Sequence, residues 1–169
     1  MTHLHQVYLS VGSNMGDPMS NCSRGLESLC ADGQVRLLAR SPFYRTQPVD
    51  YLEQDWFVNA ALLVQTALAP LDLLEKTQAI QVQMGRKDDA IRFGPRILDL
   101  DIIFYGNQVI DTPHLVVPHP RMHKRRFVLR PICDIDPTVM HPVLGKTVRE
   151  LLDQLPTDLQ DMEPCSSGC

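Results

Sequence analysis

Residues 92–103, RFGPRILDLDII, join a run of apolar residues to two acids spaced two positions apart. The apolar residues between 97 and 105 predict a buried β-strand. Side chains at i and i+2 of a strand lie on the same face, so Asp99 and Asp101 share one face. A rise of about 3.3 Å per residue separates the two carboxylates by about 7 Å. The other face is expected to carry the core side chains Leu98, Leu100 and Ile102.

The acid pair has two interpretations. Two hard oxygen donors at this separation suit Mg²⁺, which binds one or two carboxylates together with waters and phosphates. Without a cation the pair repels by roughly 1–3 kcal/mol. Taken alone, the pair fits a solvated sheet face better than a metal site.

Basic residues flank the pair on both sides in the sequence. Upstream lie Arg86, Lys87, Arg92 and Arg96. Downstream, beside His119, lie Arg121, Lys124, Arg125, Arg126 and Arg130. Each cluster separately fits a solvated helix or loop. Two metal ions and a ring of guanidinium groups are the usual apparatus for neutralising a polyphosphate during phosphoryl transfer, and basic clusters on both sides of the acid pair favour that interpretation.

Length and composition indicate one soluble domain. The chain has 169 residues, 44% of them hydrophobic, and its formal net charge is −4. We expect a single domain over residues 1–160 and a flexible tail over 161–169. No apolar run approaches the ~20 residues of a membrane helix, and no signal peptide is evident. The chain is expected in the cytoplasm, as a monomer, with no membrane or nucleic-acid partner.

Five cysteines occur at irregular spacing, which is typical of reduced cysteines in a cytosolic protein. Cys165 and Cys169 close a polar tail, EPCSSGC, for which a frayed end is favoured over a disulfide or a metal site. His119 and His123 are four residues apart, but zinc would need at least one more ligand.

Apolar periodicity predicts alternating strands and helices. Strands are expected over 6–11, 36–46, 56–66 and 97–105, and helices over 70–84, 121–129 and 148–155. Another helix begins at Pro18, capped by Asp17, after the turn GSNMGDP. The order β-α-β-β-α-β predicts a ferredoxin-like α+β fold, an antiparallel sheet with helices packed on it, plus C-terminal additions. The absence of GxGxxG argues against a Rossmann fold.

Three further residues fit either a core or a ligand site. Asn59 lies within an apolar strand, where its amide bonds either a neighbouring backbone or the edge of a heterocycle. Phe57 and Phe127 are ordinary core residues or the two sides of a sandwich around a flat ring.

The stretch RFGPRILDLDII resembles the signature of the 6-hydroxymethyl-7,8-dihydropterin pyrophosphokinase family. Further segments are similar to that family in the same order: YLSVGSNMGD, SPFYRTQP, FVNAALLVQT, QVQMGR and VPHPRMHKRRFVLRPI. Together they cover about residues 7–131. The resemblance implies transfer of pyrophosphate from ATP to the hydroxymethyl group of the pterin, with release of AMP, in folate synthesis.

The resemblance also implies a role for particular residues. Asp99 and Asp101 would bind two Mg²⁺ ions and act in catalysis with Arg86, Arg92 and Arg96. The ATP contacts would be Gln78, Arg86, Arg96, Ile102, His119 and Arg125. The pterin contacts would be Thr46, Val49, Phe57, Asn59 and Phe127.

The sequence departs from the family pattern at Phe93, Gln81 and Pro120, where some members carry tryptophan, an acid and tyrosine. Two other functions remain open. Ferredoxin-like sheets with aromatic residues also bind RNA, although the net charge and the missing RNP1 motif count against that role. Another Mg²⁺-dependent nucleotide transferase is the second alternative.

Overall fold

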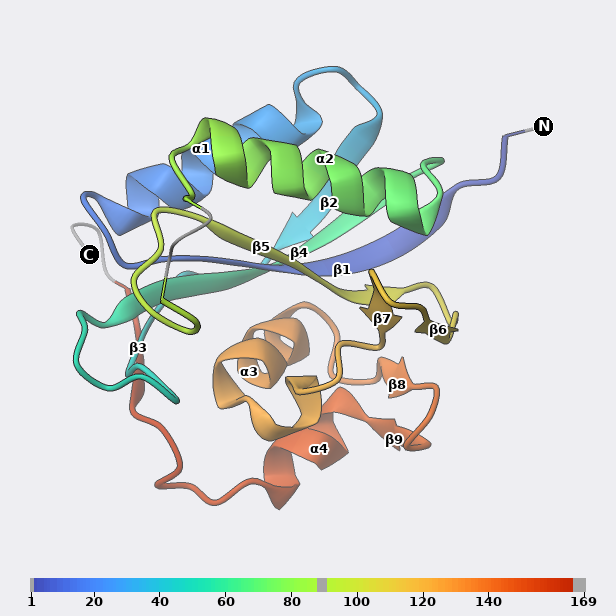
Figure 1. The fold of residues 1–169 in the computed structure, drawn as a ribbon. Coiled ribbons are helices and arrows are strands. Elements are labelled where there is room, and N and C mark those ends of the chain that lie inside the picture. The colour runs from blue at the N-terminus through green and yellow to red at the C-terminus, as the bar shows by residue number, and fades with distance from the viewer. Residues whose placement is uncertain (1, 88–90, 166–169) are drawn as a thin grey trace.

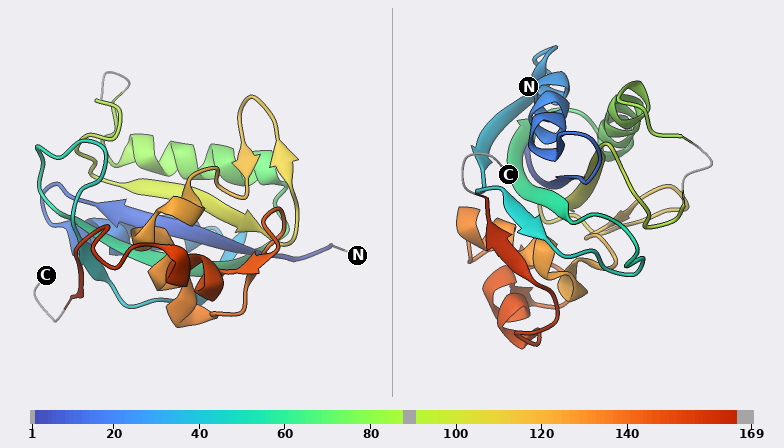
Figure 2. Two further views of the ribbon diagram at one scale, coloured as in Figure 1. Left: turned by 90° about the horizontal axis from the view of Figure 1, so that it is seen from below. Right: turned by 90° about the vertical axis from the view of Figure 1, so that its left-hand side faces the viewer.

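An antiparallel sheet with helices on both faces forms the protein (Figures 1 and 2). The computed structural model describes residues 2–87 and 91–165. The sheet strands are β1 (His5–Ser13), β2 (Val35–Arg40), β3 (Tyr44–Thr46), β4 (Phe57–Thr66), β5 (Asp99–Tyr105) and β10 (Met162–Pro164). The helices are α1 (Pro18–Cys30), α2 (Pro70–Gln83), the 3₁₀ helix η1 (Met122–Lys124), α3 (Arg126–Ile135) and α4 (Val148–Gln154). Two small hairpins are β6 (Ile110–Asp111) with β7 (Val116–Val117), and β8 (Met140–His141) with β9 (Lys146–Thr147).

Strand β1 lies between β4 and β5 in the sheet. The strand order is β10-β3-β4-β1-β5, and β2 pairs with β4 beside this path. Both neighbours of β1 run antiparallel to it, and the register places Gly12 opposite Asn59 on β4 and opposite Asp99 on β5. The predicted α+β antiparallel fold with helices packed on the sheet is confirmed.

The sheet is buried on both faces. Helices α1 and α2 cover one face, where Leu9, Leu62 and Leu100 are buried. Helices α3 and α4 cover the other, where Phe104 and Leu129 are buried. The predicted alternation along β5 is confirmed, because Leu98, Leu100 and Ile102 are all at most 4% exposed on the α1 and α2 side. The aspartates between them therefore point to the side of α3.

Two helix starts follow from capping residues. The Oδ1 atom of Asp17 accepts a hydrogen bond from the backbone N–H of Ser20 at 3.2 Å, at the start of α1 as predicted. Thr147 and Glu150 form a capping box at the start of α4, in the helix predicted over 148–155. Helix α2 follows the predicted range of 70–84 to within one residue.

Three predicted elements differ in the structure. The single strand expected over 36–46 is two strands, because Pro42, which has no N–H for a ladder hydrogen bond, lies between β2 and β3. The helix expected over 121–129 is η1 followed by α3, which continues past Pro131 to Ile135 because Leu129 and Ile132 are buried on its apolar face. The turn expected from residue 12 begins later, since β1 extends to Ser13.

The C-terminal segment lies against the sheet. Strand β10 pairs antiparallel with β3, in the part of the chain for which a flexible tail is predicted. Cys22, Cys30 and Cys133 are free thiols. Residues 166–169, including Cys169, lie outside the described residues. Within the described part of the chain, we find no helix with the length and apolar character of a membrane span.

Candidate functional site

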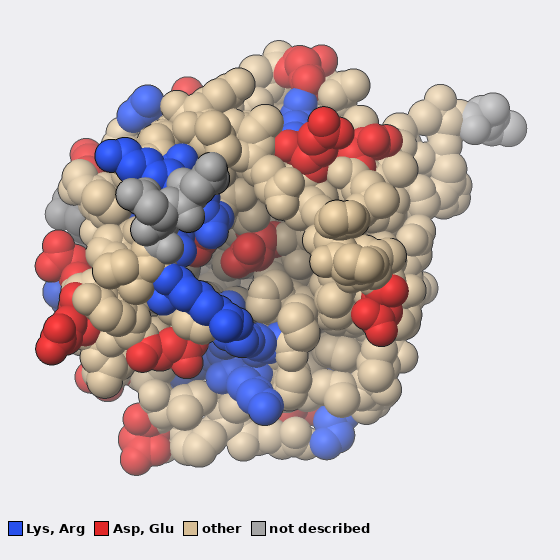
Figure 3. All heavy atoms as spheres, viewed as in Figure 1, with Lys and Arg blue, Asp and Glu red and all other residues tan. Residues whose placement is uncertain are grey.

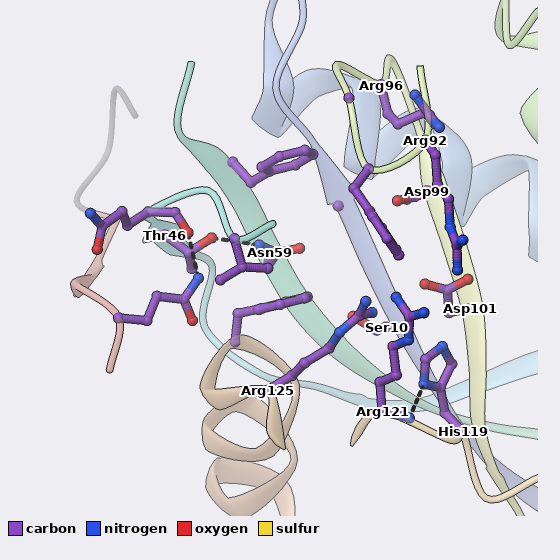
Figure 4. Close-up of a pocket in the computed structure, with 18 of the residues that line it drawn as sticks. Ser10, Thr46, Asn59, Arg92, Arg96, Asp99, Asp101, His119, Arg121 and Arg125 are labelled. Atoms are coloured by element: carbon purple, nitrogen blue, oxygen red, sulfur yellow. Dashed lines mark hydrogen bonds between the residues drawn. The ribbon is translucent and has the colours of Figure 1, made fainter. Parts of the chain in front are cut away.

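A cavity of about 390 Å³ opens on the α3 side of the sheet. The ends of β1, β4 and β5 form its floor, and residues of the loops before β4 and before β5 form part of its walls (Figure 4). The wall residues of these two loops are Gln47, Val49, Arg86, Arg92, Phe93, Gly94 and Arg96. Most of the predicted site residues line it: Thr46, Val49, Phe57, Asn59, Arg86, Arg92, Arg96, Asp99, Asp101, His119, Arg125 and Phe127. The fold thus brings together residues from five separate segments of the chain.

Two predicted site residues do not line this cavity. Gln78 is exposed on α2, and the side chain of Ile102 is buried in the core beneath the sheet. Several lining residues were not predicted from the sequence, among them Ser10, Gly12, Gln47, Gly94 and Gln160, and Arg121 was named only as a member of the downstream basic cluster. Arg121 is one of several basic residues in its segment, and no pattern distinguishes it from Lys124 or Arg126.

The acid pair lies in the floor of the pocket. Asp99 and Asp101 stand on β5 beside Gly12 and Ser10 of β1. Burial raises the pKa of both carboxyl groups, and the charge of Asp101 raises the pKa of Asp99 further, to about 6. The nearby guanidinium of Arg86, with Nη1 at 3.3 Å from Oδ1 of Asp99, acts in the opposite direction.

The raised pKa predicts that Asp99→Asn stabilises the metal-free protein. A folded-state pKa above the unfolded value means that stability falls as pH rises from 3.8 to about 6. At pH 7 the asparagine variant should be more stable by about 1 kcal/mol, a value discounted because the Asp99 side chain is 37% exposed.

Urea unfolding in the presence of a chelator at pH 7 and pH 4.5 tests this prediction, and the advantage of the variant should shrink at the lower pH. Asp153→Asn is the matched control, since Asp153 is exposed on α4 and pairs with Arg149. A variant that is less stable than the wild type at pH 7 would contradict the argument.

Arginines dominate the charge of the pocket. Five of them, against two aspartates, leave a formal excess of three positive charges in a chain whose net charge is −4. Figure 3 shows Lys and Arg side chains gathered around a hollow in which acidic side chains lie. The five are Arg86, Arg92, Arg96, Arg121 and Arg125. Such a local excess binds a polyanion in spite of the overall charge.

Phe93 lies among three of these arginines. The guanidinium carbons of Arg121, Arg92 and Arg125 are 4.6, 4.8 and 5.8 Å from the centroid of its ring. Cation–π attraction offsets part of the repulsion between the guanidinium groups. Phe93 has φ of 59°, which is unusual for a residue with a side chain. Phenylalanine stands at this position where some family members carry tryptophan, and its aromatic ring still contacts the three guanidinium groups.

His119 is a neutral hydrogen-bond donor at neutral pH. Its Nδ1 accepts a hydrogen bond from the backbone N–H of Arg121 at 3.1 Å, which leaves the proton on Nε2. Burial, with Arg125 and Arg121 nearby, lowers its pKa to about 4. The imidazole can therefore donate to an anionic oxygen without adding a positive charge.

The other end of the pocket fits a flat polar ring. Asn59 is buried at the pocket wall, and its Nδ2 donates to Oγ1 of Thr46 at 2.7 Å. The Asn59 side chain lies against Gly12 of β1, where a Cβ added to Gly12 would come to 2.4 Å from Oδ1 of Asn59. Phe57 and Phe127 also line the pocket. A buried amide and two aromatic side chains in the wall of one cavity suit a flat heterocycle.

Asn14 and Gln54 tie three loops around the pocket. The Nδ2 of Asn14 donates to Oε1 of Gln54 at 3.0 Å, and its Oδ1 accepts from the backbone N–H of Arg96 at 2.8 Å. The Nε2 of Gln54 donates to the carbonyl oxygen of Phe93 at 2.8 Å. The loops after β1, before β4 and before β5 are thereby connected.

The pocket defines a class of protein, a nucleotide-dependent transferase acting on a flat second substrate. The model of the 7,8-dihydro-6-hydroxymethylpterin-pyrophosphokinase (HPPK) family matches residues 8–137. The chain belongs to this family, and it is a diphosphokinase.

Similar proteins support the assignment. A 2-amino-4-hydroxy-6-hydroxymethyldihydropteridine pyrophosphokinase of Pseudomonas aeruginosa is 41% identical over 153 residues, 90% of this chain and 93% of the relative. One of Methylorubrum extorquens is 38% identical over 94% of this chain and 99% of its own length.

A solved structure of Plasmodium falciparum HPPK-DHPS with pteroate shares the fold. Its TM-score is 0.72 at 16% identity, and the match covers 91% of this chain but 43% of that one. This likeness concerns the fold alone. The chain likewise spans 22% of the length of the folic acid synthesis protein FOL1 of Dictyostelium discoideum, to which it is 41% identical.

Proposed function

We propose that this protein transfers pyrophosphate from ATP to the hydroxymethyl group of 6-hydroxymethyl-7,8-dihydropterin, releasing AMP, in folate synthesis. One observation carries the proposal: a single pocket joins the acids and arginines to the Asn59 and aromatic end. The two ends suit the two substrates, a polyphosphate and a flat heterocycle. A transferase must bind both at once, with the reacting atoms between the two ends.

The carboxylate pair fits Mg²⁺. Among the described residues, no group of three or more His, Cys, Asp and Glu side chains could form a protein-only metal site. A pair of carboxylates is typical of Mg²⁺, which takes its remaining ligands from water and substrate phosphates. Asp99 and Asp101 would hold two such ions. The ions, when bound, would supply positive charge to the phosphate oxygens.

The side chains of the protein bind, align and shield the substrates. Arg86, Arg92 and Arg96 contact the phosphates, and His119 donates a hydrogen bond from Nε2. Phe57 and Phe127 stack on the pterin, and Asn59, Thr46 and Val49 bind its edge. Arg125 completes the ATP contacts as the loops close over the nucleotide, which excludes water as a competing nucleophile. Gln78 and Ile102 lie on the α1 and α2 side of the sheet, away from the cavity, and are assigned no contact with ATP.

The pterin hydroxyl then attacks the β-phosphorus in line. The new bond joins the hydroxyl oxygen to the β-phosphorus. The bond between the β-phosphorus and the oxygen that bridges it to the α-phosphorus breaks, and AMP leaves with that oxygen. The hydroxyl proton is released, and we assign it to no general base. Alignment and charge neutralisation account for the catalysis.

A single incubation tests the proposal. ATP, Mg²⁺ and the reduced pterin alcohol should yield one AMP for each pterin consumed, and AMP should not form without the pterin. Production of ADP would indicate a different nucleotide-dependent transferase. Salt-sensitive RNA binding without AMP release would support the RNA-binding alternative, against which the acids in the pocket and the family membership count.

The proposal extends to the state of the protein in the cell. It acts as a monomer in the cytoplasm on small molecules, without a nucleic-acid partner. Size-exclusion chromatography with light scattering measures the oligomeric state, and a dimer would contradict this part of the proposal.

Gly12→Ala is expected to weaken pterin binding by about tenfold, because the new methyl group would displace the Asn59 amide. The backbone does not demand glycine here, since Gly12 is not among the glycines with positive φ. Titration with the pterin, in parallel with an ATP analogue, measures the effect. Affinity for the nucleotide should change by less than about threefold.

Gly33→Ala provides a matched control at a position where an added methyl group would meet nothing within 4 Å, although the φ of 78° costs some stability. Equal loss of both affinities in Gly12→Ala would point to general unfolding and contradict the proposed effect on Asn59.

A further inference from the structure

Gln160 lines the pocket from outside the part of the chain that matches the family model. The match ends at residue 137, whereas Gln160 lies in the segment between α4 and β10. It is 3% exposed. The sequence predicts no role for it, since an isolated glutamine in a polar segment carries no periodic signal.

The amide of Gln160 has one satisfied end and one unsatisfied end. Its Nε2 donates to the carbonyl oxygen of Gln47. Because that carbonyl only accepts hydrogen bonds, the amide orientation is fixed, and Oε1 is the atom on the other side. Oε1 is the one buried side-chain nitrogen or oxygen atom in the described chain that has no hydrogen-bond partner.

The position of Gln160 is set by its neighbours. The backbone N–H of Gln47 donates to the carbonyl oxygen of Asp161 at 2.9 Å, and the N–H of Asp161 donates to Oε1 of Gln47 at 3.2 Å. Arg126 Nη1 donates to the carbonyl oxygens of Thr157 at 2.9 Å and of Gln160 at 3.4 Å. The unsatisfied oxygen is therefore held in place rather than left on a free side chain.

We propose that Gln160 is a specificity-determining residue, whose Oε1 accepts a hydrogen bond from the exocyclic amino group of the bound heterocycle. A buried carbonyl without a donor is costly, and a ligand N–H removes that cost. A ring with no donor at this point would leave the oxygen unpaired, so the site would discriminate against it.

The proposed function sets the orientation of the bound ring, and this orientation places the exocyclic amino group next to Gln160. The hydroxymethyl group must point toward the acids and arginines, and on a pterin the amino group is at the opposite end of the bicycle. Gln160 lies at that opposite end, because its amide donates a hydrogen bond to the carbonyl oxygen of Gln47. Gln47 directly follows Thr46, and the Thr46 hydroxyl accepts a hydrogen bond from the Asn59 amide.

The test pairs two proteins with two ligands. Wild type and Gln160→Met are titrated with 6-hydroxymethyl-7,8-dihydropterin and with its 2-dimethylamino analogue, which has no N–H on the exocyclic nitrogen. A non-hydrolysable ATP analogue and Mg²⁺ are present. We expect Gln160→Met to bind the pterin at least about tenfold more weakly and the dimethylamino analogue within about twofold of wild type.

Other outcomes overturn the inference. If the substitution weakens both ligands equally, Gln160 acts only by holding Gln47, and if it weakens neither, the oxygen makes no contact. Affinity for the ATP analogue reports whether each variant is folded. A wild-type protein that binds the ATP analogue but not the pterin would refute the proposed function itself.

Discussion

Asp99→Asn and Asp101→Asn should each reduce Mg²⁺-dependent AMP release by about a thousandfold or more. Asparagine keeps the shape of the side chain but removes the negative charge and presents an N–H₂ group toward the cation. Burial raises the pKa of both carboxyl groups, which shows that two negative charges are unfavourable at this place even with five arginines in the pocket. A bound cation would remove that cost, so the two carboxylates favour binding of a cation. Release of AMP over a titration of Mg²⁺ measures the effect.

The expected gain in stability separates this loss of activity from unfolding. If the inactive Asp99→Asn variant has a melting temperature at or above that of the wild type, the substitution has removed catalytic activity without unfolding the protein. Asp153→Asn, on the exposed face of α4, should keep normal activity. Near-normal AMP release by both pocket variants would refute the role of the pair in binding two metal ions.

The strand that carries the acids was predictable because its signal is local. Alternation between 97 and 105 depends only on which face each side chain takes, and the sheet buries Leu98 and Leu100 as that alternation requires. The break at Pro42 also has a local cause, the missing N–H, but Phe43 and Tyr44 directly after it have high strand propensity and favoured one continuous strand in the prediction.

The remainder of the site depends on contacts between distant segments. Asn14 and Gln54 are forty residues apart, and the hydrogen bonds that join three loops arise only after the sheet has formed. Gln160 reaches the pocket because its side chain and the neighbouring backbone bond Gln47, which is 113 residues away. Polar residues in loops have no periodicity, so the sequence alone provides no signal for such pairs.

Arg96→Ala should lower the rate of AMP release by about a hundredfold or more and change the affinity for ATP by less than about threefold. In the structure the Arg96 side chain is buried, and its guanidinium donates to the carbonyl oxygens of Pro95 at 2.9 Å and Ile91 at 2.8 Å. Contacts with phosphate would replace these hydrogen bonds, so little net affinity is gained in the ground state.

The benefit arises when charge develops on the phosphates. A planar guanidinium in a pocket closed to water stabilises that charge more strongly than it stabilises bound ATP. Single-turnover rates, together with titration of a non-hydrolysable ATP analogue, separate the two effects. Arg24→Ala, an exposed position on α1 across the sheet, is the control. Equal losses of rate and affinity in Arg96→Ala would show that Arg96 only binds ATP in the ground state.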